Sequence, residues 1–157
     1  MRRLKWAIVA GACLWVVSLP LAAYAASSQK TSMTYAFALA MYGAGSFLCH
    51  QRPERSFHLW MTAFPVCARC AGIYVGGAFG AVTAFRHAPA LRRPVFNVMA
   101  AALPSLATLV YEWTTGAVPD NWIRALAGFP IGVATGVILL SALGSMSHDA
   151  GGSEQIR

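Results

Sequence analysis

Three cysteines and two histidines have the types and spacing of a metal site. Cys67 and Cys70 form a Cys-x-x-Cys pair, and Cys49 lies next to His50 eighteen residues upstream of it. Such a pair can place two thiolates on one metal ion, and a third sulfur with one imidazole completes the tetrahedral donor set of structural zinc sites. We therefore expect Cys49, His50, Cys67 and Cys70 to bind zinc, with His58 as the alternative to His50.

The same cysteines also allow a redox interpretation. Cys67 and Cys70 fall at the expected start of a helix, where free amide groups and the charge of Arg69 stabilise a thiolate. Cys49 would then be the exchange partner in a membrane thiol-disulfide oxidoreductase. A third interpretation is inert, buried cysteines, which we adopt for Cys13. The sequence lacks the motifs of serine hydrolases, P-loop enzymes and zinc proteases, so whether the chain is an enzyme stays open.

A polar cluster accompanies the cysteines. It contains four arginines and two further polar residues, namely Arg52, Arg55, Arg69, Arg124, Glu112 and Asn121. Charged side chains at membrane depth are costly and are usually paired or functional. Glu112 and Arg124 could form an ion pair between two segments, whereas guanidinium groups without a partner suit a lipid phosphate or another anion. The cluster predicts either structural pairing or an anion- or lipid-binding site.

Composition places these residues in a membrane protein. Of the 157 residues, 57% are hydrophobic and 11% are charged, whereas about a quarter of residues are charged in soluble domains. The net charge of +7 gathers in short clusters at the ends of apolar segments, where membrane proteins meet anionic headgroups. We therefore expect an all-α, multi-pass protein of the cell membrane. Its expected partners are the lipid bilayer and anionic headgroups, without nucleic acid, and the sequence names no protein partner.

The apolar segments predict one helical membrane domain over residues 1–144, followed by a flexible polar tail over 145–157. The expected segments are 6–26, 34–48, 67–85, 94–111 and 123–144. A membrane-spanning helix needs about 20 apolar residues, so the short segment 34–48 leaves a bundle of four or five spans. The first segment competes with a cleaved signal peptide, but its apolar stretch is longer than a usual signal core.

Glycines recur every four residues in the third and fifth segments. They are Gly72, Gly76 and Gly80 in one segment and Gly128, Gly132 and Gly136 in the other. This spacing puts each series on one helix face, where the missing side chains allow two backbones to approach closely. We expect Gly-x-x-x-Gly packing between these two helices.

The orientation in the membrane is not decided by charge. With the N-terminus inside, five spans and four spans both place seven Lys and Arg residues inside and five outside, although the two sets differ. In both arrangements the loops 49–65 and 112–122 share one face, because two spans separate them. The cysteines and the polar cluster are therefore expected on one face, whose compartment stays open.

These residues also resemble a family signature. The sequence Cys-His-Gln at 49–51, Arg-Ser at 55–56 and Pro-Val-Cys-Ala-Arg-Cys-Ala-Gly-Ile-Tyr at 65–74 resembles domain-of-unknown-function family 2085, small predicted prokaryotic membrane proteins. The later Asn121-x-x-Arg124 stretch is also similar to that family. The resemblance implies an integral membrane protein and implies no reaction or ligand. Its matched positions are Cys49, His50, Gln51, Arg55, Ser56, Cys67, Arg69 and Cys70.

Overall fold

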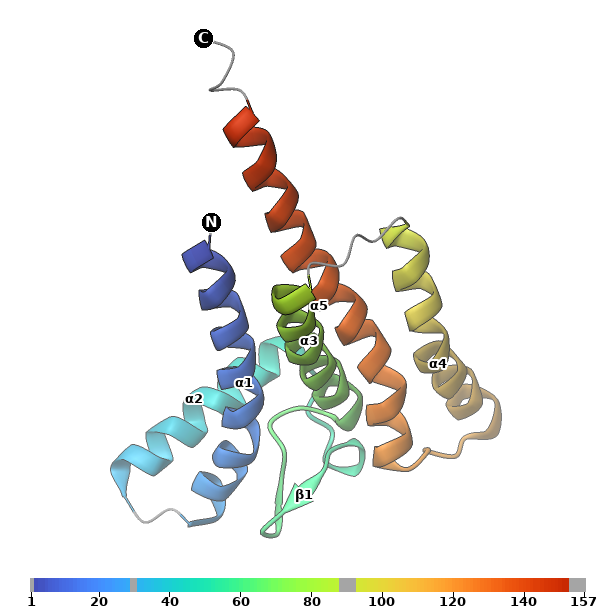
Figure 1. Ribbon diagram of the computed structural model, residues 1–157. Helices are drawn as coiled ribbons and strands as arrows, with labels where there is room; N and C mark the ends of the chain where they lie inside the picture. Colours follow the sequence, from blue (N-terminus) through green and yellow to red (C-terminus); the bar gives the residue numbers. More distant parts are fainter. Residues whose placement is uncertain (1, 29–30, 88–92, 153–157) are drawn as a thin grey trace.

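The computed structural model describes residues 2–28, 31–87 and 93–152, with side chains described only up to residue 144. These ranges form the helices α1 (Arg2–Ser28), α2 (Ser32–Leu48), α3 (Ala68–His87), α4 (Pro94–Thr115) and α5 (Asn121–Gly152). Between α2 and α3 lie a 3-10 turn, η1 (Pro53–Arg55), and the short antiparallel strands β1 (His58–Leu59) and β2 (Thr62–Ala63) (Figure 1). The fold is all-α and of membrane type, as the sequence predicts.

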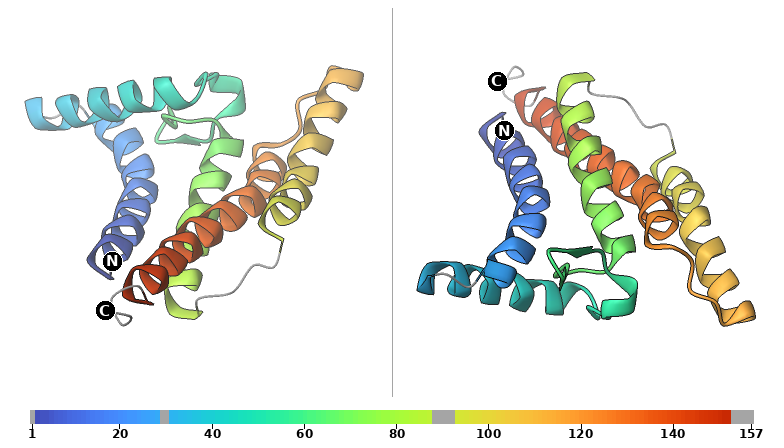
Figure 2. Two further views of the ribbon diagram at one scale, coloured as in Figure 1. Left: turned by 90° about the horizontal axis from the view of Figure 1, so that it is seen from above. Right: turned by 90° about the horizontal axis from the view of Figure 1, so that it is seen from below.

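Within the described part of the chain, four helices are long and apolar enough to cross a membrane. They are α1, α3, α4 and the part Asn121–Gly144 of α5. The short segment 34–48 corresponds to α2, which has 17 residues and is not among them. Figure 2 shows α2 running across the ends of α1 and α3 rather than alongside them. The hairpin and the α4–α5 connection lie at this same end of the bundle, opposite the start of α1 (Figure 1).

The helices α3 and α5 pack more extensively than any other pair of described elements. Both glycine series lie at this contact. A Cβ atom on Gly72 would overlap the carbonyl oxygen of Ala125, and one on Gly132 would overlap that of Ile73. Backbones that approach this closely gain van der Waals contact, which holds helices together in lipid. The contact fixes the starts of α3 and α5, and hence their polar side chains, relative to each other.

The first and last helices complete this arrangement. The helix α1 packs against α2 and α3 and buries Leu19, Ala22 and Ala23. Cys13 packs against the hydrophobic cluster that α1 shares with α3 and α5.

The helix α5 continues to Gly152, beyond the expected end of the fifth segment at residue 144. Residues 153–157 lie outside the described residues, so the flexible tail over 145–157 stays a prediction.

Candidate functional site: a cysteine triad beside an arginine cluster

Three thiols converge where α2 ends and α3 begins. The Sγ atoms of Cys49, Cys67 and Cys70 all lie within 4.8 Å of one another. Cys49 directly follows α2, Cys67 precedes α3, and Cys70 lies in the first turn of α3. The backbone N–H of Cys67 donates a hydrogen bond to Cys49 Sγ at 3.2 Å, and all three thiols are free and half-buried. A three-residue spacing at a helix start puts Cys67 and Cys70 on one side of α3.

Gln51 holds the two chain segments of the triad together. Its side-chain amide nitrogen donates to the carbonyl oxygen of Tyr42 at 2.7 Å and to that of Pro65 at 2.6 Å. The backbone of Gln51 is left-handed, with φ 47°. Gly45 makes room for this contact, because a Cβ there would lie 2.6 Å from the Gln51 amide nitrogen. The last turns of α2 are thereby tied to the residue two positions before Cys67.

The immediate surroundings of Cys67 favour its ionised form. A hydrogen bond from the thiol of Cys70 is the main cause that lowers the pKa of Cys67 to about 5, and burial opposes this shift. The backbone N–H of Cys70, the thiol of Cys49 and the positive charge of Arg124 lower the pKa further. A thiolate is the form of cysteine that binds a metal or attacks a disulfide. The Cys67 thiolate therefore suits both the metal and the redox interpretation of the triad.

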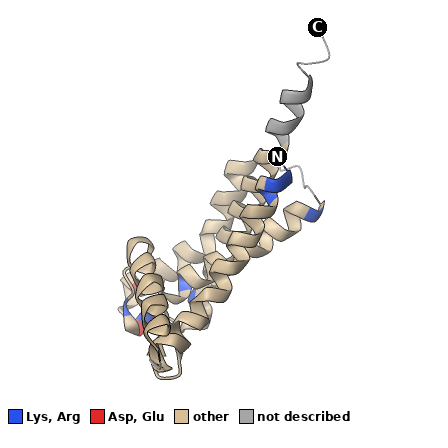
Figure 3. Ribbon diagram, turned by 90° about the vertical axis from the view of Figure 1, so that its left-hand side faces the viewer, with Lys and Arg blue, Asp and Glu red and all other residues tan. Residues whose placement is uncertain are grey.

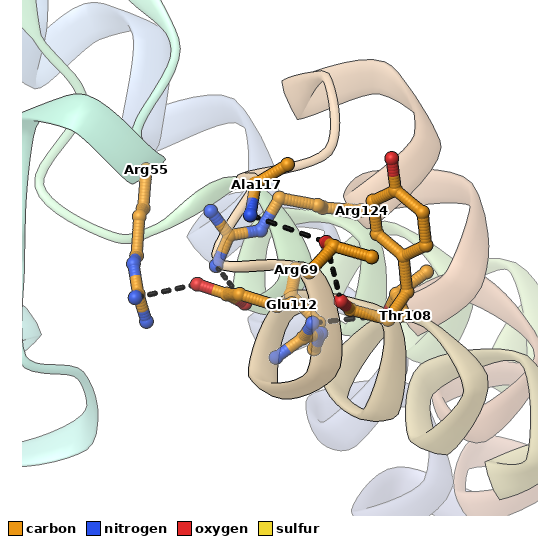
Figure 4. Close-up of polar contacts among 8 residues, drawn as sticks. Arg55, Arg69, Thr108, Glu112, Ala117 and Arg124 are labelled. Atoms are coloured by element: carbon orange, nitrogen blue, oxygen red, sulfur yellow. Dashed lines mark hydrogen bonds and ion pairs between the residues drawn. The ribbon is translucent and has the colours of Figure 1, made fainter.

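Three arginines surround one buried carboxylate next to the triad. Glu112, in the last turn of α4, lies 2.5 Å from Arg55 Nη2 through Oε1 and 3.8 Å from Arg124 Nη2 through Oε2. Neither carboxylate oxygen accepts an aligned hydrogen bond among the described residues, so the pairing is mainly electrostatic. Arg69 Nη2 donates to Thr108 Oγ1 at 2.9 Å, one helical turn before Glu112 (Figure 4). The loops 49–65 and 112–122 do share one face, because Arg55 and Glu112 join them.

The loop that carries Arg55 is anchored to the start of α5. Asn121, the first residue of α5, donates from its side-chain amide to the carbonyl oxygen of Ser56 at 2.9 Å. Ser56 is fully buried, and its hydroxyl donates to the carbonyl oxygen of Arg52 at 3.0 Å. These two bonds fix η1 against α5 and direct Arg55 towards Glu112.

One cavity of about 500 Å³ connects the triad with the arginines. Its lining includes the three cysteines and four arginines, Arg52, Arg55, Arg69 and Arg124. His50 is exposed and lines the same cavity, but it is not part of the group of thiols that lie within 4.8 Å. His58 lies in β1 and lines a separate apolar cavity beside Trp122. The described arrangement therefore offers three sulfur ligands and leaves the expected histidine ligand outside their immediate group.

Sequence reasoning missed the polar face of α4. Ser105 donates from its hydroxyl to the carbonyl oxygen of Ala127 in α5 at 2.8 Å, and Thr108 accepts the hydrogen bond from Arg69. With Glu112, these residues follow a three- and four-residue spacing, which places them on one helix face. This polar stripe within an otherwise apolar segment was the signal that could have identified them.

Comparison with known proteins agrees with this membrane architecture. A family model described as a predicted membrane protein, DUF2085, matches residues 49–138, from the first cysteine of the triad into α5. An uncharacterised protein of Methanocaldococcus jannaschii is 39% identical over 70 residues, which cover 44% of this chain and 45% of that protein. One from Methanothermobacter thermautotrophicus is 32% identical over 99 residues, covering 59% of this chain and 84% of that protein.

The match with the Methanocaldococcus protein thus spans less than half the length of that relative. No solved structure matches the chain. The family model, by contrast, covers more than half of the chain and includes every residue of the triad and of the arginine cluster. The chain therefore belongs to the family of predicted membrane proteins known as domain of unknown function 2085.

Proposed function

We propose that this protein of the cell membrane binds one zinc ion through Cys49, Cys67 and Cys70. The observation that carries the proposal is the convergence of three Sγ atoms within 4.8 Å. Sulfurs that share a tetrahedral zinc ion, with Zn–S bonds of about 2.3 Å, lie about 3.8 Å apart. Small movements of the side chains would therefore bring all three onto one ion. Thiolate ligands favour zinc over the harder magnesium and calcium ions.

The fourth position of this zinc ion is the open question of the site. His50 lines the cavity and follows Cys49 directly, so a change of its side-chain conformation could supply a nitrogen ligand. A water molecule or another small ligand would fill the position otherwise. Structural zinc sites use four protein ligands, whereas catalytic sites keep one position open. With either ligand, the ion would join the end of α2 to the start of α3 and order the loop that carries Arg52 and Arg55.

The redox alternative uses the same three thiols. It is favoured by the lowered pKa of Cys67 at the start of α3 and by the Sγ atoms of Cys70 and Cys49, which lie within 4.8 Å of it. Formation of a Cys67–Cys70 disulfide would release two electrons and two protons to an acceptor of the quinone class. The two candidate functions differ in what the isolated protein carries, namely bound metal or a disulfide.

Elemental analysis of the purified protein distinguishes them. We expect about one zinc per chain, and Cys49→Ser, Cys67→Ser and Cys70→Ser should each lower this content. Cys13→Ser is the matched control, because Cys13 packs in the hydrophobic cluster around α1 and is not part of the triad. His50→Ala tests the fourth ligand. Protein without stoichiometric metal that carries a Cys67–Cys70 disulfide on thiol trapping would contradict the zinc proposal and support the redox alternative.

A further inference from the structure

The cavity beside the triad has an unbalanced positive charge. Four arginines line it, and the adjacent Glu112 pairs with two of them, Arg55 and Arg124. The four arginines and Glu112 alone leave a surplus of three positive charges, and a zinc ion with three thiolates would leave two. Uncompensated charge is costly at the edge of a low-dielectric membrane domain. We therefore expect an anion to bind in the cavity.

Arg124 lines this cavity and has buried donors without a partner among the described residues. Its side chain is 2% exposed, yet Nε and Nη1 have no hydrogen-bond partner among the described residues. The Nε atoms of Arg55 and Arg69 are likewise buried without a partner there. Buried donors of this kind are rare in native proteins, because leaving them unpaired costs free energy. Guanidinium groups present paired N–H donors that match the oxygens of a phosphate group.

The arginines come from three separate elements and meet at one place. Arg52 and Arg55 belong to the loop around η1, Arg69 to α3 and Arg124 to α5. Figure 4 shows Arg55, Arg69 and Arg124 around the Glu112 carboxylate, with none of their Nε atoms in a drawn contact. The carboxylate engages single Nη atoms of Arg55 and Arg124 and leaves their other donors free. Pairing with Glu112 thus holds the guanidinium groups in place without saturating them.

We propose that this cavity binds a phosphate group, with Arg124 and Arg69 as its buried donors and Arg52 and Arg55 at the loop side. The volume of about 500 Å³ lies within the range of about 300–1,000 Å³ typical of small-molecule sites. It therefore admits the phosphate together with part of the molecule that carries it. Leu48 and Trp113 add apolar lining, so the carrier is either a phospholipid headgroup or a soluble phosphate compound. The proposal does not depend on a bound metal.

Binding measurements on the full-length protein in neutral detergent test this site. One arm titrates inorganic phosphate by calorimetry, and the other counts bound lipid by native mass spectrometry in micelles with phosphatidylglycerol or phosphatidylcholine. We expect Arg124→Gln and Arg52→Gln to weaken binding at least about tenfold, the equivalent of one charge-assisted hydrogen bond. Arg52 is exposed, so Arg52→Gln tests the site even if Arg124→Gln fails to fold. Arg86→Gln, an exposed change at the far end of α3, is the control.

The two arms identify the carrier of the phosphate. Arginine-dependent binding of inorganic phosphate assigns a soluble ligand, and arginine-dependent retention of phosphatidylglycerol alone assigns a lipid headgroup. The proposal is overturned if neither probe binds, or if Arg86→Gln weakens binding as much as Arg52→Gln does. Zinc measured in the same samples separates the two proposals. Phosphate binding without zinc would overturn only the zinc site, and joint loss of zinc and phosphate in Arg52→Gln would overturn the phosphate site.

Discussion

Single side chains set the geometry of the triad, and Gln51 is the clearest case. Its backbone adopts a left-handed conformation, and its side-chain amide donates hydrogen bonds to carbonyl oxygens of two separate segments. Replacing it by alanine would leave the Pro65 carbonyl without its donor and would remove the additional bond to the Tyr42 carbonyl, which lies within α2. The loss of a buried partner costs about 1–3 kcal/mol. Gln51 therefore acts on the proposed metal site through the backbone rather than as a ligand.

We expect Gln51→Ala to lower the thermal midpoint of the purified protein and to weaken zinc binding at the same time. The reason is that Cys49 and Cys67 lose the tie between their segments. Ser46→Ala is the control, since the Ser46 hydroxyl is exposed and bonds to the carbonyl oxygen of Gly43 within the same helix. Fluorescence-monitored melting and zinc titration provide the two measurements. A variant with unchanged stability and unchanged zinc affinity would show that Gln51 has no positioning role.

Glu112 is a second residue whose replacement should change the stability of the protein. Glu112→Gln keeps the shape of the side chain but removes the negative charge beside Arg55 and Arg124. Breaking a buried pair on one side costs about 3–5 kcal/mol, so the folded fraction in detergent should fall strongly. Glu54→Gln provides the control, because Glu54 is exposed in η1 on the same face. Equal melting curves for the two variants would refute a stabilising role for Glu112.

Whole elements are positioned mainly by the contact of α3 with α5. A Cβ on Gly76 would overlap the carbonyl oxygen of Phe129, whereas one on Gly11 in α1 meets no atom within 4 Å. Gly76→Leu should therefore separate the helices and reduce the yield of monodisperse protein, while Gly11→Leu should not. Overpacking costs about 1–3 kcal/mol even where side chains can adjust. The overlap at Gly76 is with backbone atoms, which cannot adjust in this way. Size-exclusion profiles with melting midpoints check this, and matching profiles for both variants would disprove it.

The helices and the site differ in how far the sequence could predict them. The spans follow from local properties, namely apolar length and glycine spacing, and the expected segments 67–85 and 94–111 agree closely with α3 and α4. The crosswise path of α2 involves non-local bonds such as that from the Tyr42 hydroxyl to the carbonyl oxygen of Ala63. The Cys-x-x-Cys spacing predicted a thiol cluster, but the place of His50 depends on a loop conformation. The polar partners of Arg69 and Arg55 lie on α4. The sequence could predict only that residues of this cluster lie on the same face of the membrane, and not which of them pair.

At the scale of the molecule, charge differs between the two ends of the bundle. Among the described residues, Figure 3 shows only Lys and Arg near the start of α1, and basic together with acidic residues at the opposite end. With four spans, the start of α1, the α3–α4 connection and the end of α5 share one side. Seven Lys and Arg residues then belong to the side of the N-terminus and five to the side of the site. The positive-inside rule then favours the N-terminal end as cytoplasmic and the site as external.

Labelling of introduced cysteines in intact cells tests this orientation. Met61→Cys lies at the fully exposed tip of the hairpin beside the site, and Arg86→Cys lies at the exposed opposite end of α3. A membrane-impermeant maleimide should label Met61→Cys above the background of the native protein, and should label Arg86→Cys only after the membrane is opened. The reverse pattern would place the site in the cytoplasm and contradict the four-span arrangement with an internal N-terminus.

An external site changes the relation between the metal and redox interpretations. Thiols outside the cytoplasm face oxidising conditions, in which disulfides persist. Zinc would then keep the triad reduced by occupying the sulfurs of Cys49, Cys67 and Cys70, which are close enough to react once the ion leaves.

We expect treatment of intact cells with a chelator to convert two of the three thiols into a disulfide, detected by thiol trapping before and after reduction. Cys13, held in the membrane cluster of α1, should stay reduced. Thiols of the triad that remain reduced after zinc is lost would show either that the site is cytoplasmic or that zinc does not protect it, and the cysteine-labelling result decides which.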